Sequence, residues 1–369
     1  MFYIINCINY TNCTSIYNLQ STMNYNGVNI LLTGGLGYIG SHTVLELVKS
    51  KCNIMILDIN KSTKRKDNLY KLIDEEDSHL VKVEHIDITN GFEMYKLFKN
   101  NVFDVCIHFA AFKNVGESDE EPLSYYCNNV GGLLTLLETC VYNGCHNFVF
   151  SSSCTVYGKD EQVPFVDKSI DELDIRNTTN PYATSKYMCE KIIEDVCKRD
   201  HRLRCINLRY FNPIGSHESG LLNDDCMEGK TANLMPLLLN VLEEKIERVH
   251  IFGKDYDTKD GTCVRDFVHV VDVARAHVKA INKLFTMDVG KAHTYNIGTG
   301  KGCTVLELIK AMSKVTDKII PCKFDKRREG DLPKAYACTK KTEEELGFVT
   351  EKTIEDMCRD AYKKIENNL

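Results

Sequence analysis

Short apolar runs alternate with amphipathic stretches from Val28 onward. The runs are rich in Ile, Val, Leu and Phe, which is typical of strands buried in a parallel sheet, and apolar residues recur at helical spacing between them. This alternation predicts an α/β fold with a doubly wound, Rossmann-like parallel sheet. The predicted strands are 28–33, 53–57, 80–85, 105–109, 147–150 and 205–208, and the predicted helices are 38–49, 91–100, 125–143 and 182–199.

The regular alternation ends near Tyr210, where loops rich in Gly, Asp and Asn begin to separate shorter elements. We therefore expect a Rossmann domain over residues 27–210. A second, smaller α/β domain is expected over residues 211–369, mainly for substrate, with some of its segments returning to the first domain. Residues 1–26 are rich in Asn and Tyr and are interrupted by polar residues every two or three positions, which predicts a disordered extension.

Three glycines mark the turn between the first predicted strand and the first predicted helix. Gly34, Gly37 and Gly40 have the spacing Gly-x-x-Gly-x-x-Gly, and Asp58 ends the next strand 18 residues further on. Glycine is needed because side chains would hold a pyrophosphate away from the amides of the helix N-terminus. The motif in this context predicts a dinucleotide site. The Asp58 carboxylate suits a ribose and would repel a 2′-phosphate, which favours NAD over NADP. Three basic residues close behind weaken that preference: Lys61, Lys64 and Arg65.

Tyr182 and Lys186 lie four residues apart at the start of a predicted helix, so their side chains share one face. The Tyr-x-x-x-Lys pattern occurs four times in the chain. Most of these pairs must lie on ordinary solvated helix faces. Tyr182 stands out because the strand at 147–150 ends in three serines, Ser151 to Ser153, at the edge where ligands bind. A serine, a tyrosine and a lysine are therefore predicted to converge there.

The amino-acid composition indicates which kinds of ligand and partner the protein is expected to bind. The chain has 369 residues, of which 43% are hydrophobic and 27% charged, as expected of a folded globular protein. A net charge of -6 without long runs of one sign gives no reason to expect nucleic acid or a membrane surface as partner. The 17 cysteines and 11 histidines lack the spacings of metal sites. We expect no metal, and we interpret the cysteines as reduced core thiols of a cytoplasmic protein.

Eight stretches together resemble the extended short-chain dehydrogenase/reductases, and within them the UDP-glucose 4-epimerase family. They are TGGLGYIGSHT, HFAAFKNVGES, FSSSCTVYG, NPYATSK, LRYFNPIGSH, GTCVRDFVHVVD, YNIGTG and RREGDLP. The resemblance extends from about Val28 to Asn367. It implies an NAD-dependent isomerase of nucleotide sugars with Ser153, Tyr182 and Lys186 as the catalytic residues.

The resemblance also implies two sets of binding residues. Those implied for NAD are Gly34, Gly37, Tyr38, Ile39, Gly40, Asp58, Asp87, Ile88, Phe109, Ala110, Ala111, Lys113, Asn129, Ser151, Tyr182, Lys186 and Tyr210. Those implied for a UDP-sugar are Lys113, Ser153, Tyr182, Phe211, Asn212, Asn233, Leu234, Arg265, Arg328, Asp331 and Ala335. Both arginines suit a diphosphate because guanidinium groups match phosphate oxygens and stay charged.

In the implied reaction Tyr182, as phenolate, takes the proton of the sugar 4-hydroxyl while C4 is oxidised and later reduced from the opposite face. The tyrosine pKa would have to fall from near 10 to about 7, a stabilisation of roughly 4 kcal/mol, with Lys186 and the nicotinamide as sources of positive charge. The rival interpretation is a nucleotide-sugar 4,6-dehydratase or decarboxylase of the same fold. Such enzymes need an acid after the serine, where this chain has Cys154 and Thr155.

Two finer expectations follow from the same resemblance. Ala335 is aligned with the residue beside the sugar 2-substituent, and its small size would admit UDP-N-acetylglucosamine and UDP-N-acetylgalactosamine. A shift of one residue in the alignment would instead place Tyr336 there. Relatives form homodimers by packing two helices from each subunit, and the matching helices are 125–143 and 182–199.

Overall fold

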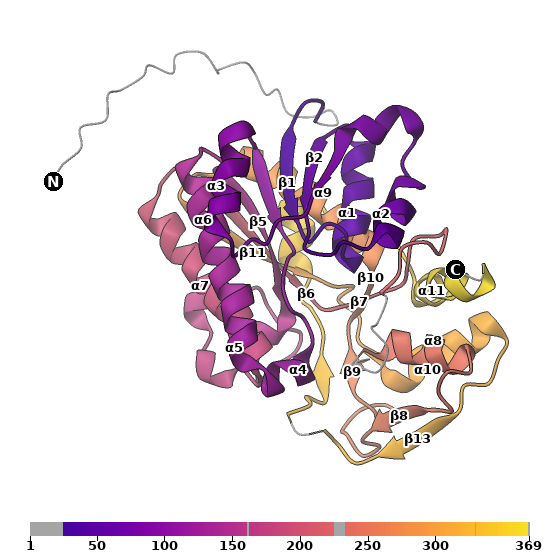
Figure 1. The fold of residues 1–369 in the computed structure, drawn as a ribbon. Coiled ribbons are helices and arrows are strands. Elements are labelled where there is room, and N and C mark those ends of the chain that lie inside the picture. The colour runs from indigo at the N-terminus through magenta and orange to yellow at the C-terminus, as the bar shows by residue number, and fades with distance from the viewer. Residues whose placement is uncertain (1–24, 161, 225–232, 329, 368–369) are drawn as a thin grey trace, which may run out of the picture.

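A parallel sheet of seven strands forms the centre of the protein (Figure 1) in the computed structural model, which describes residues 25–160, 162–224, 233–328 and 330–367. The strand order is β11-β6-β5-β4-β1-β2-β3. The strands are β1 (Asn29–Thr33), β2 (Asn53–Leu57), β3 (Val81–Glu84), β4 (Val105–His108), β5 (Asn147–Ser153), β6 (Arg204–Tyr210) and β11 (Lys291–Ile297). The order reverses at β1, between β2 and β4, which confirms the predicted doubly wound sheet.

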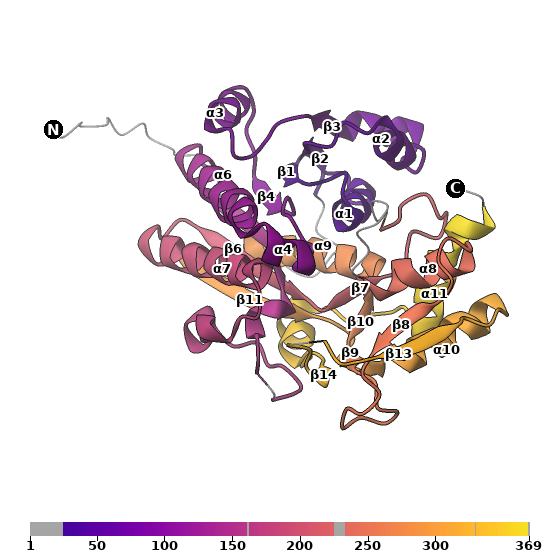
Figure 2. The ribbon, with the colours of Figure 1, turned by 60° about the horizontal axis from the view of Figure 1, so that its bottom comes forward.

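Helices cover both faces of this sheet (Figure 2). One face carries α1 (Tyr38–Lys49), α2 (Thr63–Tyr70) and α9 (Val270–Thr286), and the other carries α3 (Gly91–Asn100), α6 (Gly132–Tyr142) and α7 (Pro181–Arg199). Successive residues of β1 serve the two faces in turn, as strand geometry requires. Ile30 and Leu32 pack with α1 and α9, whereas Leu31 packs with α3 and α6.

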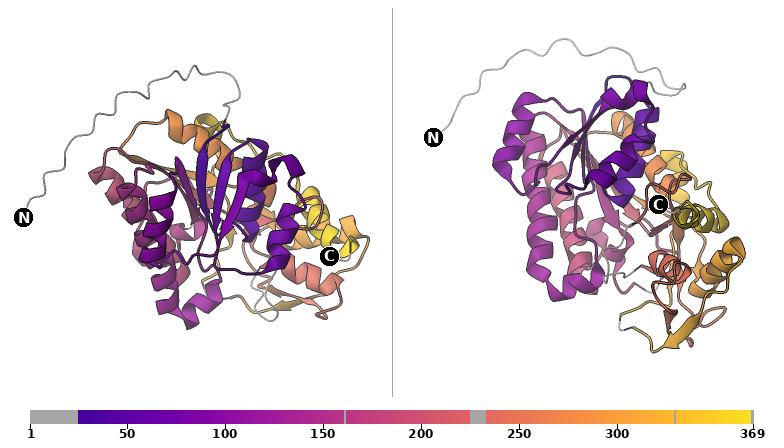
Figure 3. Two further views of the ribbon diagram at one scale, coloured as in Figure 1. Left: turned by 45° about the horizontal axis from the view of Figure 1, so that its top comes forward. Right: turned by 45° about the vertical axis from the view of Figure 1, so that its right-hand side comes forward.

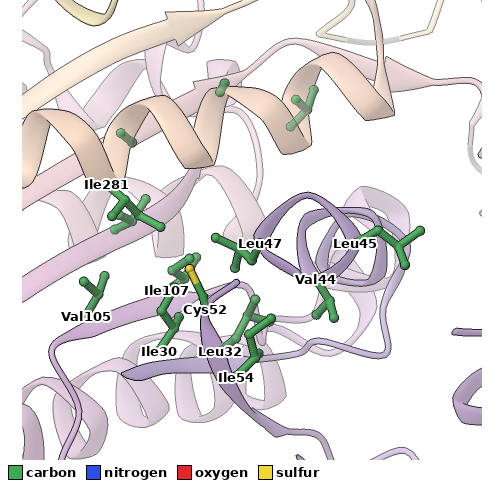
Figure 4. Close-up of a cluster of buried hydrophobic side chains, with 14 of the residues drawn as sticks. Ile30, Leu32, Val44, Leu45, Leu47, Cys52, Ile54, Val105, Ile107 and Ile281 are labelled. Atoms are coloured by element: carbon green, nitrogen blue, oxygen red, sulfur yellow. The ribbon is translucent and has the colours of Figure 1, made fainter. Parts of the chain in front are cut away.

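The close-up in Figure 4 shows the first of these faces. Val44 and Leu47 of α1 lie against Ile30 and Leu32 of β1, and Ile281 of α9 closes the cluster from above. These five side chains are completely buried. Burial of each contributes about 1.5–3 kcal/mol to folding. The cluster therefore fixes α1 on the sheet and, with it, the glycine turn that precedes α1.

The predicted helix 125–143 is divided in the structure. It consists of α5 (Pro122–Tyr125), a π-helical turn (Tyr126–Gly131) and α6. Directly after the π-helical turn, Gly132 packs closely against the loop that follows β3. A Cβ at Gly132 would lie 2.7 Å from a side-chain carbon of Ile88. The spacing of apolar residues in the sequence predicts which face of this segment is buried. It does not show that one turn is π-helical and contains an extra residue.

The seventh strand, β11, and the helix α9 come from the sequence after Tyr210 and complete the Rossmann layer. No strand was predicted at 291–297, because its first three residues are Lys, Ala and His and only its last four are buried. Of the predicted extension, residues 1–24 lie outside the described residues. Tyr25 is 6% exposed and packs into the core beside β1.

The remaining elements gather beside the sheet (Figure 3) around a core of their own. They are the helices α8 (Leu234–Leu242), α10 (Val305–Thr316) and α11 (Ile354–Glu366) with the short strands β7 (Asn212–Ile214), β8 (Val249–Phe252), β9 (Val264–Arg265), β10 (Phe267–His269), β12 (Cys303–Thr304), β13 (Cys322–Asp325) and β14 (Lys334–Ala335). The short α4 (Val115–Glu120) follows β4 on the Rossmann side. Within the described part of the chain, no helix combines the length and apolarity needed to cross a membrane.

Candidate active site

The turn between β1 and α1 leaves no room for side chains. Gly34 has a φ of +72°, and a Cβ there would lie 2.8 Å from the backbone nitrogen of Ala110. A Cβ on Gly40 would lie only 2.3 Å from the carbonyl oxygen of Gly34. Gly37 is the N-cap of α1 and carries no capping side chain. The start of α1 is therefore open to a negatively charged group, as the predicted pyrophosphate site requires.

Replacing Gly40 by alanine is expected to distort this turn, because the added methyl would collide with backbone atoms that cannot rotate away. We expect a loss of about 1–3 kcal/mol in the free energy of unfolding and a clear fall in NAD retained on purification. Gly91→Ala is the matched control, since its Cβ would meet its nearest atom at 3.7 Å. Thermal unfolding and NAD released by acid measure both effects. Full NAD content in Gly40→Ala would contradict the assigned site.

A cavity of about 430 Å³ adjoins the glycine turn at the carboxyl ends of β1, β2, β4 and β5. It brings together all but one of the residues predicted for the cofactor: Gly34, Gly37, Tyr38, Ile39, Gly40, Asp58, Asp87, Ile88, Phe109, Ala110, Ala111, Lys113, Ser151, Tyr182, Lys186 and Tyr210. The Asp58 carboxylate accepts hydrogen bonds from the amides of Leu36 and Asn60, both at 2.9 Å, which hold it at the mouth of the turn. Arg65 also lines this cavity and stands near Asp58.

Asn129 is the exception: it does not line this cavity, and its direct contact with the cofactor stays a prediction. Its side chain is 2% exposed and braces the loop after β4. Its Oδ1 accepts from the amide of Phe112 at 2.8 Å, and its Nδ2 donates to the Phe112 carbonyl and the Ser185 hydroxyl, each at 3.1 Å. The neighbouring Asn128 lines the cavity instead.

The predicted catalytic side chains converge where this cavity meets a second one. Asn180 caps α7 by accepting from the amide of Ala183 at 2.9 Å, and Pro181 occupies the first helical position. Tyr182 therefore lies in the first turn of α7, with Lys186 one turn later. Tyr182 lines both cavities, and its hydroxyl is hydrogen-bonded to Ser153 at the end of β5.

Burial governs the proton affinities of this pair. It raises the pKa of Tyr182 to about 12, although the hydrogen bond from Ser153 opposes the shift. It also lowers the pKa of Lys186 to about 8. The protein alone therefore does not produce the low tyrosine pKa that was predicted. The Lys186 ammonium donates to the Ser151 carbonyl at 2.7 Å and lies 4.8 Å from the centre of the Phe150 ring.

The second cavity, of about 350 Å³, extends from Tyr182 towards α8, β8 and β9. It collects the predicted substrate residues Lys113, Ser153, Tyr182, Phe211, Asn212, Asn233, Leu234, Arg265, Arg328 and Asp331. Arg265 is held by the Leu332 carbonyl at 2.9 Å and by the Asp331 carboxylate at 3.2 Å. Arg328 lies 3.8 Å over the ring of Phe252. Two guanidinium groups and the ring of Phe252 therefore line this cavity together with Tyr182.

Ala335 does not line this cavity, and its place beside the sugar stays a prediction. It pairs with Arg265, which does line the cavity, in the register of β14 with β9. Ala335 and Cys154 both pack against the cluster that includes Phe165. The ring of Tyr336 lies against Gly302, 3.5 Å from the position of a Cβ there.

Asp224 is the functional candidate that sequence reasoning missed. It lines both cavities and forms an ion pair with Lys113 at 2.7 Å. It also accepts from the Asn233 side chain at 3.4 Å. Asp224 lies in a polar loop with no local pattern, and only the fold brings it opposite Lys113. Among the described residues there is no group of three or more His, Cys, Asp or Glu side chains arranged for a metal ion, and the described cysteines are all unpaired.

Comparison with known proteins gives a consistent result. Residues 30–298 match the model of the NAD dependent epimerase/dehydratase family. The chain is 42% identical over 341 residues to UDP-glucose 4-epimerase 2 of Arabidopsis thaliana, which covers 92% of this chain and 95% of that protein.

Two crystal structures extend the likeness to the fold. The UDP-glucose 4-epimerase of Stenotrophomonas maltophila, with bound NAD and formylated UDP-arabinopyranose, superimposes with a TM-score of 0.85 at 34% identity, over 92% of this chain and 99% of that one. The enzyme of Bifidobacterium longum, in complex with NAD+ and UDP, gives 0.84 at 39% identity, over 92% and 99%.

Proposed function

The chain belongs to the NAD dependent epimerase/dehydratase family, and on that premise we propose that it is a UDP-glucose 4-epimerase, which interconverts UDP-galactose and UDP-glucose. One observation carries this proposal. Ser153, Tyr182 and Lys186 meet at the junction of a dinucleotide cavity with a second cavity that holds Arg265 and Arg328. A reacting sugar carbon at that junction would face the cofactor on one side and a hydroxyl base on the other.

The residues of the first cavity fit NAD. The glycine turn is a cradle that any Cβ would obstruct, and Asp58 offers a carboxylate at the end of β2. When bound, NAD takes up hydride from C4 of the sugar and returns it to the other face, so no net oxidation results. Lys113, Ser151 and Tyr210 complete the wall of this cavity.

In the second cavity, different residues bind the diphosphate and act on the sugar. Arg265 and Arg328 suit the diphosphate, because guanidinium groups form paired hydrogen bonds with phosphate oxygens. Tyr182 removes the proton of the sugar 4-hydroxyl and later returns it, while Ser153 orients that hydroxyl. Lys186 supplies the buried positive charge that favours the ionised form of Tyr182. Between oxidation and reduction at C4, the 4-keto sugar must rotate so that its other face is presented to the cofactor. The cavity beside Tyr182 must be wide enough for this rotation.

The dehydratase interpretation lacks its acid. Cys154 and Thr155 follow Ser153, and burial raises the pKa of the Cys154 thiol to about 12. The carboxylates that line the substrate cavity, within the described residues, are Asp224 and Asp331. Each is in an ion pair, with Lys113 and Arg265 respectively. Neither is a free acid beside the reacting carbon.

Incubation of the purified protein with UDP-galactose tests the proposal. We expect UDP-glucose to form without added NAD, because the cofactor should remain bound through purification. Separation of the two nucleotide sugars by chromatography measures the conversion. A 4-keto-6-deoxy product, or NADH accumulating in step with turnover, would contradict it.

We further propose that the enzyme is a cytoplasmic homodimer with a Rossmann domain over residues 27–210, to which α9 and β11 return, and a UDP-sugar domain mainly over 211–369. The exposed apolar residues Leu134 and Tyr142 on α6, at 49% and 81%, and Met188 on α7, at 37%, support pairing through these helices. The unpaired cysteines support a reducing compartment.

A further inference from the structure

A buried ion pair lies directly beneath the catalytic residues. Tyr182, Lys186 and Glu190 follow one another at intervals of four residues on α7, so they form one stripe along the helix. The Glu190 and Arg209 side chains are both completely inaccessible to solvent. Their contact is bidentate, with Nε to Oε1 at 2.9 Å and Nη2 to Oε2 at 2.6 Å. It therefore fixes α7 against β6 both in distance and in rotation.

The Glu190 carboxylate also reaches the neighbouring strand. Its Oε1 accepts a hydrogen bond from the hydroxyl of Ser152, which stands directly opposite Arg209 in the β5–β6 register. Ser152 lies between the two serines of the site. The Ser151 carbonyl accepts a hydrogen bond from the Lys186 ammonium, and the Ser153 hydroxyl is hydrogen-bonded to Tyr182. One carboxylate thus joins the helix that carries the base to the strand end that carries its partners.

Arg209 has its remaining hydrogen bonds satisfied away from the cavity. Its Nη1 donates to the Tyr157 hydroxyl at 3.0 Å and to the Lys168 carbonyl at 2.9 Å. Tyr157 donates in turn to the Asn296 side chain of β11 at 2.7 Å. Every partner is supplied by a different segment, so the network spans three adjacent strands and α7.

Stability alone does not account for such an arrangement, because well-packed apolar residues commonly replace a buried ion pair at no cost in stability. We propose that Glu190 and Arg209 are positioning residues, which hold α7 against the ends of β5 and β6 so that Tyr182, Lys186 and Ser153 keep their mutual geometry. This inference rests on the proposed function for its kinetic part. The negative charge of Glu190 also acts on Lys186, favouring its protonated state against burial.

The test separates position from stability. Glu190→Leu and Arg209→Met each leave a buried charge unpaired, whereas the double variant removes both charges together. We expect each single variant to melt well below wild type and the double variant to melt above both. The kcat of the double variant should nevertheless stay about 100-fold below wild type, with the KM for UDP-galactose nearly unchanged, because small misplacements of reacting groups have effects of that size. A purely structural role predicts that kcat recovers together with the melting temperature, and that result would overturn the proposal.

Hydrogen exchange gives a second measure that needs no turnover. Amides of residues 182–187 should exchange faster in the double variant than in wild type, and equal rates would also overturn the proposal. Ile193→Ala is the matched control, because Ile193 is fully buried on the same helix and takes part in neither the ion pair nor the cavities. It should lower the melting temperature while leaving kcat unchanged. If wild type failed to epimerise UDP-galactose, the proposed function would fall, and the exchange rates would still decide this inference.

Discussion

Replacing Tyr182 by phenylalanine is expected to lower kcat by at least about 100-fold, and by up to about 10,000-fold, the usual contribution of a general acid-base group. The variant keeps the aromatic ring that lines both cavities and removes only the hydroxyl that is bonded to Ser153. The cofactor content should change little. Initial rates with UDP-galactose and NAD released by acid measure the two quantities.

The chain supplies its own control in Tyr187, which also stands four residues before a lysine on α7. Its hydroxyl donates to the carbonyls of Ile170 and Leu173, at 3.2 and 2.9 Å, on the side away from the cavities. Tyr187→Phe should therefore lose a little stability, about 1 kcal/mol, and retain its kcat. If Tyr182→Phe kept a tenth or more of wild-type activity, Tyr182 would not be the base.

The high pKa of Tyr182 explains why the hydroxyl cannot act alone. Burial raises the pKa to about 12, so the protonated form dominates at neutral pH. Ionisation then requires positive charge nearby, and we propose that the buried ammonium of Lys186 supplies it. Because burial lowers the pKa of Lys186 to about 8, that charge is lost as the pH rises through this value. The negative charge of Glu190 raises the pKa of Lys186 and so opposes the loss of this positive charge.

The glycine turn could be predicted from the sequence because each of its requirements is local. Strand, turn and helix are consecutive in the chain, and a Cβ at Gly40 would collide with the carbonyl oxygen of Gly34 in the same turn. Tyr182 and Lys186 were likewise predictable, since four residues on one helix fix their relation. The end of β5 next to them was recognised from its three serines.

Features that depend on distant segments were not predictable in the same way. The strand β11 becomes part of the sheet only by pairing with β6, since its own sequence begins with polar residues. Asp224 acquires its place by facing Lys113, more than a hundred residues earlier in the chain. In each case tertiary contacts, rather than local pattern, decide the position.

We expect substrate breadth to depend on the small side chain of Ala335. We propose that the enzyme accepts UDP-N-acetylgalactosamine as well as UDP-galactose, because Ala335 is small and its register partner Arg265 lines the substrate cavity. Ala335→Tyr would place a bulky ring beside this wall of the cavity. We expect this variant to lose the acetylated substrate by more than about a thousandfold, equivalent to roughly 4 kcal/mol, while its rate with UDP-galactose changes little.

Tyr336→Ala decides between the two residues that the alignment leaves in competition. The Tyr336 ring lies against Gly302 and does not line the substrate cavity, so we expect this ring to have no part in the choice of sugar. The ratio of kcat/KM for the two nucleotide sugars, measured in wild type and both variants, is the informative quantity. Rejection of UDP-N-acetylgalactosamine by wild type, relieved by Tyr336→Ala, would show that Tyr336 restricts the pocket. Acceptance by wild type and rejection by Ala335→Tyr would instead locate the selectivity at residue 335, because the added ring can clash with the acetyl group and not with a hydroxyl.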